Sequence, residues 1–415
     1  MPAYMKYFDD SKVLGLWFTI ISVLTWILTF DLGIGNGLRN NLVEAISKNN
    51  RQKVKQYISS AYIIISIIVA FSYIISTVIF PIINWNKIFN ISMDIISKEI
   101  LLKTVQIVFV GIMLQFLLKL ITSILYALQK SAIPNLLVLC TTIIQLLYVV
   151  LAKKHSTEEN LLNLARIYVL AVNIPLAIAT ISIFMTKLKN CKPSIKYFKL
   201  ELAKEVMKLG GYFFFIQIMY MVLMNTNEFI ITWLYGSDKV VEYQIYYKLF
   251  IFIGLILNLA LTPIWSAVTK ASAEKNFEWI KKLYKLLKKL SIIGIACEFA
   301  FILIFQMVVD IWLKDNAIQV NYIYALIFST FGSTFIFNAV LCSVANGLGL
   351  LKTQLVFYTL GAIIKIPMIV LLNKICNEWI IVILVNSVIL LSFSIVQNKN
   401  LKKYLNNYKE EIENV

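Results

Sequence analysis

The 415-residue sequence has few charged residues and almost no histidine. Asp, Glu, Lys and Arg together make up 15% of the chain, histidine occurs once, and 60% of the residues are hydrophobic. Soluble globular domains carry about 25% charged residues. This scarcity of charge excludes an ordinary soluble enzyme and predicts that lipid surrounds most of the chain.

The sequence also lacks any pattern of metal ligands or paired cysteines. The histidine, His155, has no second histidine or cysteine cluster near it, so a zinc or redox site is not expected. The cysteines have neither paired nor metal-binding spacing and mostly lie in or beside apolar segments, which is typical of small packing residues. They are Cys140, Cys191, Cys297, Cys342 and Cys376. We therefore expect no metal and no cofactor.

Long apolar segments recur along the whole chain. A helix needs about 20 mostly apolar residues to cross a bilayer, and the sequence predicts about eleven such spans. They cover residues 13–38, 58–83, 101–128, 133–151, 162–188, 209–235, 243–268, 290–311, 320–345, 355–372 and 379–396. The predicted fold class is an all-α polytopic membrane protein.

The net charge of +17 lies mostly in every second connection between spans. Lys and Arg accumulate in short cytoplasmic loops, so the C-terminus is predicted to lie on the cytoplasmic side of the membrane. We expect this membrane to be the cytoplasmic (inner) membrane of a bacterium. This distribution favours anionic membrane lipids over nucleic acid as partners. Eleven spans with a cytoplasmic C-terminus would place Met1 outside, which suggests that a first helix is missing.

The longest polar connection divides the chain near its middle. We predict an N-terminal bundle over residues 1–188, a cytoplasmic linker over 189–208, a C-terminal bundle over 209–397 and a cytoplasmic tail over 398–415. With the missing helix restored, this makes two six-helix bundles, and such halves are often related by a pseudo-two-fold axis along the membrane normal. The amphipathic segment 277–290 is expected to be an interfacial helix on the cytoplasmic leaflet.

Four segments resemble one family of exporters. They are GLWFTIISVLTWILTFDLGIGNGLRNNLVEAISKNNRQKVKQYISSAY (15–62), MLQFLLKLITSILYALQKSAIP (113–134), NTNEFIITWLYGSDKVVEYQIYYKLF (225–250) and TPIWSAVTKASAEKNFEWIKK (262–282). The chain resembles polysaccharide flippases of the multidrug/oligosaccharidyl-lipid/polysaccharide exporter superfamily. The resemblance implies a polyprenyl-diphosphate-linked oligosaccharide as substrate, alternating access as mechanism, and a polysaccharide polymerase and glycosyltransferases as partners. The chain departs from this family at Asn227 and Glu228, where the family commonly has Asp followed by Asn.

Charged residues inside predicted spans are the candidate functional residues, because each costs about 2.5–3.5 kcal/mol at the bilayer centre. Lys119 and Lys365 lie near the centres of predicted spans in opposite bundles, where they could face one shared cavity and attract the diphosphate. Lys248 and Arg39 could assist them. Snorkelling or an internal ion pair is the alternative for the lysines.

Three acidic residues are candidates for ion coupling or gating. Glu298 lies near the centre of its predicted span, where a carboxyl group is easily protonated, although a permanently neutral acid is the alternative. Glu228 lies closer to a span end. Asp31 begins a polar stripe, although the alternative is that Asp31 and Arg39 merely terminate the helix at the cytoplasmic interface. Nearby, Gly33 and Gly37 form a small-xxx-small pair that permits close helix approach.

Two other functions remain open. A multidrug cation antiporter of the same superfamily should present acidic and aromatic groups to its substrate. A membrane polysaccharide polymerase or glycosyltransferase needs catalytic carboxylates on a sizeable outer loop, but the longest such loop, 84–100, offers only Asp94 and Glu99. We therefore expect a transporter and not an enzyme.

Overall fold

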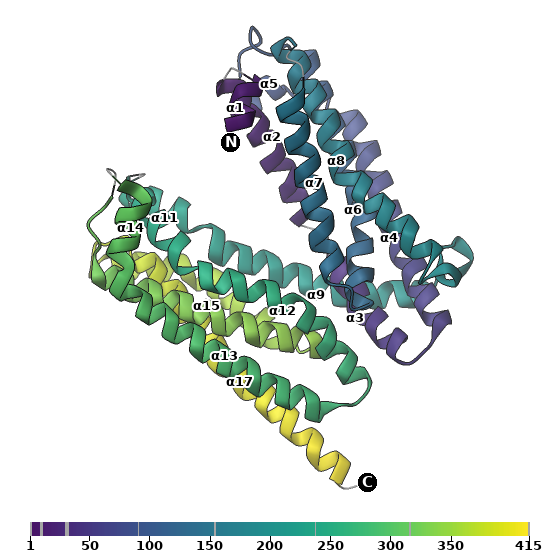
Figure 1. Cartoon of the computed structure of the whole chain (residues 1–415), viewed down its shortest axis with the longest axis vertical. Coiled ribbons are helices and arrows are strands. Elements are labelled where there is room, and N and C mark those ends of the chain that lie inside the picture. The colour runs from purple at the N-terminus through teal and green to yellow at the C-terminus, as the bar shows by residue number, and fades with distance from the viewer. Residues whose placement is uncertain are drawn as a thin grey trace. The chain divides into compact units, whose positions relative to one another are not determined.

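The computed structural model describes residues 2–8, 11–29, 33–89, 91–152, 155–236, 238–314 and 317–413. Across these ranges the regular structure is entirely helical. The chain separates into two compact units, Met1–Gly211 and Tyr212–Val415. The all-α prediction is confirmed. Figure 1 shows that each unit consists of long helices running side by side.

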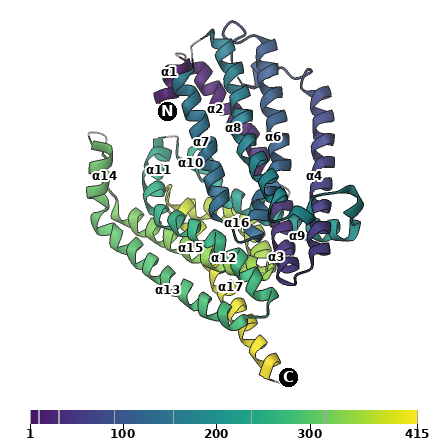
Figure 2. The same cartoon turned by 45° about the vertical axis from the view of Figure 1, so that its right-hand side comes forward.

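The N-terminal unit is built around one central helix, α6, which packs against α2, α3, α4 and α8. Figure 2 shows α6, α7 and α8 as neighbouring long helices. The elements of this unit are α1 (Pro2–Phe8), α2 (Ser11–Thr29), α3 (Ile34–Ser47), α4 (Arg51–Ile79), α5 (Trp85–Ile88), α6 (Lys98–Ala127), α7 (Ala132–Leu151), α8 (Thr157–Met185) and the 3-10 helices η1 (Lys189–Cys191) and η2 (Ile195–Tyr197).

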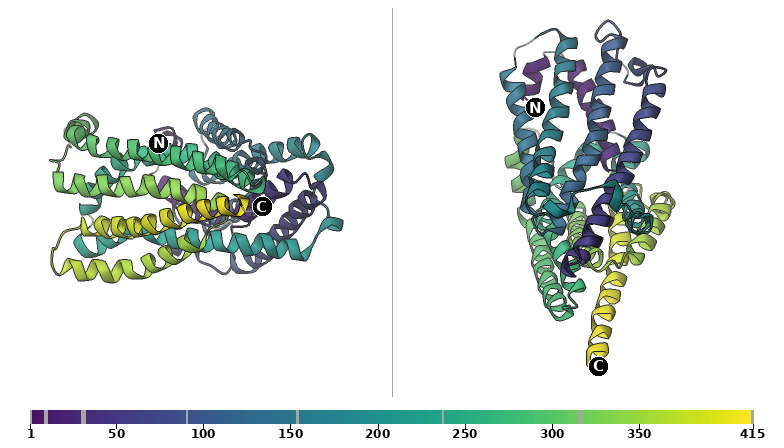
Figure 3. Two further views of the ribbon diagram at one scale, coloured as in Figure 1. Left: turned by 90° about the horizontal axis from the view of Figure 1, so that it is seen from below. Right: turned by 90° about the vertical axis from the view of Figure 1, so that its right-hand side faces the viewer.

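The C-terminal unit also has a central helix, α15, which packs against α11, α12, α13 and α17. Helix α17 (yellow in Figure 3) extends to the end of the described chain. The boundary between the units falls within α9. The elements are α9 (Leu200–Asn225), α10 (Asn227–Tyr235), α11 (Asp238–Phe250), α12 (Phe252–Ala273), α13 (Phe277–Phe301), η3 (Ile302–Ile304), α14 (Phe305–Leu313), α15 (Tyr322–Leu348), α16 (Lys352–Asn373) and α17 (Ile381–Glu413).

The two units use the same kind of turn between long helices. A residue with positive φ follows each of α3, α6, α12 and α15, namely Asn49 (51°), Gln129 (60°), Lys275 (58°) and Gly349 (71°). In the first and third of these turns an asparagine comes next, and its side chain caps the following helix. Asn50 accepts a hydrogen bond from Lys53 N, and Asn276 accepts one from Trp279 N. Such caps stabilise a helix start by about 1 kcal/mol, so polar turn residues set where these helices begin.

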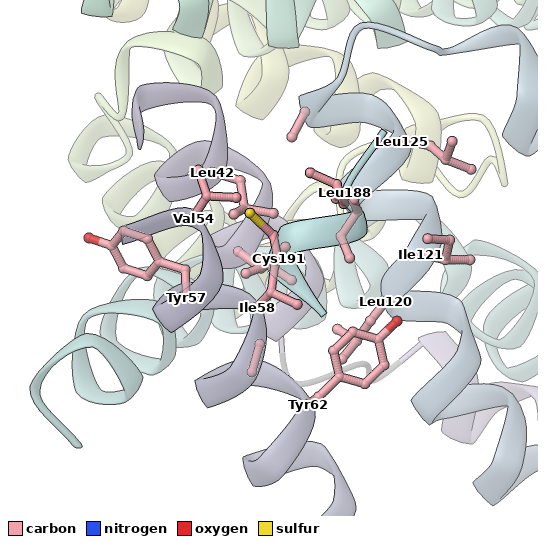
Figure 4. Close-up of a cluster of buried hydrophobic side chains, with 14 of the residues drawn as sticks. Leu42, Val54, Tyr57, Ile58, Tyr62, Leu120, Ile121, Leu125, Leu188 and Cys191 are labelled. Atoms are coloured by element: carbon pink, nitrogen blue, oxygen red, sulfur yellow. The ribbon is translucent and has the colours of Figure 1, made fainter. Parts of the chain in front are cut away.

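Aliphatic side chains form the core of the N-terminal unit where α3, α4 and α6 meet. Leu42, Ile58 and Ile121 of these three helices belong to one cluster of buried side chains. Figure 4 shows Leu42 and Ile58 close to Cys191 of η1. Cys191 is buried, as expected of a packing residue, and burial raises the pKa of its thiol. Its free thiol therefore acts here as a small apolar group.

Close approach of α3 and α9 depends on glycine. A Cβ on Gly37 would lie 2.4 Å from the backbone oxygen of Val206 and 2.9 Å from the backbone nitrogen of Gly210, whereas a Cβ on Gly210 would lie 2.9 Å from the carbonyl of Gly33. The backbones meet because neither side carries a side chain. The small-residue pair predicted from the sequence is thus a helix contact.

Ten helices or helix pairs of the described chain are long and apolar enough to cross a membrane. They are α4, α6, α7, α8, α9 with α10, α12, α13 with α14, α15, α16 and α17. The eleventh predicted span, 13–38, does not form one continuous described helix, because α2 ends at Thr29 and α3 begins at Ile34. Within this region the described chain contains a shorter apolar helical segment, Lys12–Ile21.

Two other expectations about helices need correction. The predicted span 243–268 is divided at Ile251 between α11 and α12. Segment 277–290 is not a separate interfacial helix, because it forms the first half of α13, which continues unbroken to Phe301. The apolar face of that segment was recognised, but it packs against protein: Ile280, Tyr284 and Leu287 are buried in a core shared with α15 and α17. The predicted linker, 189–208, contains η1, η2 and the first turns of α9.

Candidate functional site

The predicted site residues lie in both units. Arg39 and Lys119 belong to the N-terminal unit, and the C-terminal unit contains Glu228, Lys248, Glu298 and Lys365. Asp31 lies outside the described residues. The expectation that Lys119 and Lys365 face one shared cavity stays a prediction.

In the N-terminal unit, Lys119 is half-buried on α6 and lines a small cavity with Gly35, Phe116 and Ser123. The volume of this cavity is about 20 Å³, enough for about one water molecule. A diphosphate does not fit there. Contact between Lys119 and such a group within this cavity would therefore require a more open conformation of this region.

Arg39 is almost completely buried between α3 and α6. Its guanidinium carbon lies 4.6 Å from the centre of the Tyr126 ring, a favourable cation–π distance. The planar cation therefore joins two helices of the N-terminal unit. In this conformation the guanidinium group contacts the Tyr126 ring of the protein itself.

The C-terminal unit buries Lys365 of α16, which is 1% exposed. Its ammonium donates hydrogen bonds to Leu223 O (2.6 Å), Thr226 Oγ1 (2.8 Å) and Asn227 Oδ1 (2.7 Å). An ammonium has three donors, and three acceptors are present. We call this arrangement of Lys365 with the three oxygens the lysine cage.

The lysine cage is held in place by a second layer of polar side chains. Asn386 of α17 donates to Asn227 Oδ1 (2.8 Å), and Asn227 Nδ2 donates to Tyr243 Oη of α11 (3.3 Å). Five helices, α9, α10, α11, α16 and α17, thereby meet through one network. Such a network fixes the orientation of the Asn227 amide, whose oxygen faces the ammonium.

Glu298 of α13 is the second buried charge-bearing residue of this unit, with no exposed surface. Neither carboxyl oxygen has a hydrogen-bond partner. The group lies against α15, where a Cβ on Gly332 would be 2.8 Å from the Glu298 carboxyl carbon and 2.7 Å from Phe250 O. Gly332 thus provides the space that the carboxyl group occupies. An ionised carboxylate without partners is very costly in such a place, so the geometry favours a neutral acid.

Aromatic side chains surround the same part of the unit. Phe250 stacks on Phe328 and packs against Phe301 and Phe305, with ring centroids 4.9–6.2 Å apart. The ring centroid of Trp379 lies 6.0 Å from that of Phe328. Glu298 is therefore close to an aromatic cluster, which the sequence did not reveal because its members come from four distant segments.

The remaining two predicted residues lie at the surface of the described chain. Lys248 is exposed on α11, and Glu228 is exposed on α10, where it accepts a hydrogen bond from Gln244. Neither side chain joins the lysine cage. The adjacent residue, Asn227, does join it.

Most of the cage was not predicted from the sequence. Leu223 contributes a backbone oxygen, which leaves no trace in its side chain, and Thr226 looks like an ordinary helix residue. Asn386 had a usable signal, because it is a single amide within the apolar segment 379–396. Its partner, however, is 159 positions away in the sequence.

A basic pocket lies in the N-terminal unit at the turn between α3 and α4. Its volume is about 360 Å³, and it is lined in part by Asn50, Arg51, Lys187 and Lys189. Arg51, Lys187 and Lys189, together with the N-terminus of α4, give the pocket a positive potential. Among the described residues, no group of three or more His, Cys, Asp or Glu side chains could hold a metal ion.

Structural comparison relates this arrangement to known transporters. An outward-facing multidrug resistance MATE family transporter of the MOP superfamily has a TM-score of 0.74 and 13% identity, covering 98% of this chain and 91% of the other. MATE in the bent conformation has a TM-score of 0.81 and 12% identity, covering 99% and 92%. The Vibrio cholerae MATE transporter VcmN in the bent form has a TM-score of 0.74 and 12% identity, covering 98% and 93%.

These similarities establish the fold: the chain has a MATE-like fold with two helical bundles. No protein-family model and no curated protein sequence matches the chain. At 12–13% identity a shared fold does not carry a shared substrate.

Proposed function

We propose that this multi-pass membrane protein is a secondary transporter that works by alternating access between its two helical bundles. The observation that carries the proposal is the MATE-like fold over nearly the whole chain. The ten apolar helices fit the same function. The buried ionisable groups on α13 and α16 are the kind of residue that marks ion or substrate pathways in membranes.

The first candidate substrate is an organic cation exchanged for protons. One structural neighbour is described as a multidrug resistance transporter. The C-terminal unit of the present chain combines a buried carboxyl group, Glu298, with an aromatic cluster at Phe250 and Phe328. Acidic and aromatic groups suit a cationic, apolar molecule. Loss of the Glu298 proton would supply a negative charge, and its return would release the cation.

The test is efflux of a fluorescent cation from proteoliposomes that contain the purified full-length chain. An imposed pH gradient should drive accumulation or efflux, and the gradient should be consumed in the presence of substrate. Liposomes with Glu298→Gln protein serve as the matched control. Efflux at the rate of protein-free liposomes would contradict cation antiport.

The second candidate is the flipping of a polyprenyl-diphosphate-linked oligosaccharide, which the sequence resemblance favours. Of the three buried charge-bearing side chains among the described residues, Arg39 and Lys365 are basic, and Lys119 is a half-buried base on α6. Glycan export restored in a flippase-deleted strain, without cation efflux, would select this function. A polymerase and glycosyltransferases would then be its expected functional partners.

We also propose that the loops rich in Lys and Arg lie on the cytoplasmic side of an inner membrane, where they contact anionic lipids. These loops include the pocket at Arg51 and Lys187. Positive loops and anionic headgroups attract one another at the cytoplasmic leaflet. In a cysteine-free background, a membrane-impermeant thiol reagent added from outside should label Lys239→Cys and spare Asn276→Cys. The reverse pattern would invert the proposed orientation.

A further inference from the structure

We propose that the three oxygens of the lysine cage form a monovalent-cation site, of the kind that takes Na⁺, and that Lys365 fills it with a covalently attached cation. This inference concerns what occupies the site and does not depend on the transported substrate. It predicts that removing the lysine side chain converts the cage into a binding site for a free cation.

The chemistry of the ligands carries the first step. Leu223 O, Thr226 Oγ1 and Asn227 Oδ1 are a carbonyl, a hydroxyl and an amide oxygen, all neutral and all within 2.6–2.8 Å of the Lys365 ammonium. Neutral oxygens replace the hydration shell of alkali cations in selective sites. Divalent cations are usually bound with one or more carboxylates, and the cage contains none. The ligand set therefore matches a single positive charge.

The position of the cage in the fold carries the second step. Leu223 lies in the last turn of α9, and Thr226 separates α9 from α10. Carbonyls in a final helical turn lack intrahelical partners, and interrupted membrane helices direct such carbonyls at bound cations. Lys365 satisfies this carbonyl in the native chain. Without the lysine, the carbonyl would still point into the cage.

A further oxygen is available beside the cage. Asn386 is 1% exposed, and its Oδ1 has no hydrogen-bond partner, although its Nδ2 donates to Asn227 Oδ1 at 2.8 Å. Half a turn of the amide would exchange these two atoms and direct the oxygen toward the same region. A free cation could then have four protein oxygens, whereas the ammonium needs only three.

The test compares the thermal unfolding of purified full-length native protein and Lys365→Ala in NaCl, NH₄Cl and choline chloride at equal ionic strength. Choline is too large for the space left by a lysine side chain. For Lys365→Ala we expect the unfolding temperature to rise saturably by about 5 °C in Na⁺ or NH₄⁺ relative to choline, as expected for ligand binding to the folded state. Native protein should unfold at the same temperature in all three salts.

Two matched variants sharpen the result. Lys352→Ala removes an exposed lysine from the same helix and should show no cation response. Lys365→Ala combined with Asn227→Leu deletes one cage oxygen and should lose most of the response. Equal unfolding of Lys365→Ala in Na⁺ and choline would overturn the proposal, and so would an equal Na⁺ response of the native protein. Extraction and purification are run in parallel in each salt, and failure to recover Lys365→Ala in any of them counts against the proposal.

Discussion

The lysine cage and the Glu298 region bury opposite charges in opposite kinds of surroundings. Lys365 has an acceptor for each ammonium proton, whereas both oxygens of Glu298 lack a partner. The exposed fractions of the two side chains are nearly equal, at 1% and 0%, so burial alone does not distinguish them. The difference in hydrogen bonding indicates that Lys365 stabilises the fold as a charged group, while Glu298 is tolerated as a neutral acid that could gain or lose a proton.

The first prediction concerns Lys365→Met. Methionine fills similar space but leaves Leu223 O, Thr226 Oγ1 and Asn227 Oδ1 without their shared donor. Each of the three oxygens loses a hydrogen bond to a charged group, although Asn386 still donates to Asn227 Oδ1. Hydrogen bonds to charged groups contribute about 1.5–3 kcal/mol each, so we expect the free energy of unfolding to fall by about 3 kcal/mol or more in a sodium-free buffer. Denaturant-induced unfolding of the purified protein in detergent solution measures this change. Lys352→Met, at an exposed position of the same helix, should unfold like the native protein, and equal stability of the two variants would remove the cage from the list of stabilising features.

The second prediction concerns Gly332→Ala. The new Cβ would lie 2.7 Å from Phe250 O and 2.8 Å from the Glu298 carboxyl carbon, and overpacking of this kind costs about 1–3 kcal/mol. Gly294→Ala on α13 is the control, because its Cβ would meet only side-chain atoms at 3.4 Å or more.

The double variant Gly332→Ala with Glu298→Ala tests whether the carboxyl group is the source of this cost. Removing the carboxyl group should recover part of the lost stability, since residues in contact do not behave additively. Strictly additive effects of the two substitutions would mean that Gly332 and Glu298 do not share this space.

The third prediction concerns Glu298→Gln. Because neither oxygen has a partner, the isosteric amide breaks no hydrogen bond but adds one buried N–H donor, so we expect the free energy of unfolding to fall by about 1 kcal/mol. It removes the ionisable proton, so pH-driven transport should be lost while the protein remains folded. Substrate efflux is measured against external pH, with protein amount matched. Efflux that still follows the pH gradient would assign Glu298 a purely structural role.

The fourth prediction has the smallest effect on stability. Lys119 is half-buried in the N-terminal unit, so Lys119→Gln should change the free energy of unfolding by less than about 0.5 kcal/mol. If the substrate carries a diphosphate, glycan export should fall with Gln and be better retained with Arg, which keeps the charge with different geometry. Normal export by both variants would leave Lys119 without a role in substrate binding.

Much of the helical architecture could be read from the sequence because lipid demands long apolar segments. Spans such as 101–128 and 133–151 agree with α6 and α7 within three residues at each end. The break at Ile251 could not be read, because apolar residues continue through it. The packing of segment 277–290 against α15 and α17 could not be predicted, because an amphipathic face has the same sequence pattern whether it lies on a lipid surface or on other helices.

The candidate site divides in the same way. Sequence position alone singled out Lys365 and Glu298, because ionisable residues are rare inside apolar spans. Their surroundings depend on residues far away in the chain, such as Thr226 at a separation of 139 positions and Gly332 on another helix. Local composition cannot specify such pairings.

The sequence by itself determined that the chain is helical, lies in a membrane and carries a few ionisable residues within its apolar segments, where a charge is energetically unfavourable. These properties follow from composition and segment length. Only the tertiary structure decided that Lys365 is satisfied by three neutral oxygens and that Glu298 has no partner. Hydrogen bonding between distant helices depends on which faces meet, and packing at positions such as Gly37 and Gly332 sets how closely they can do so.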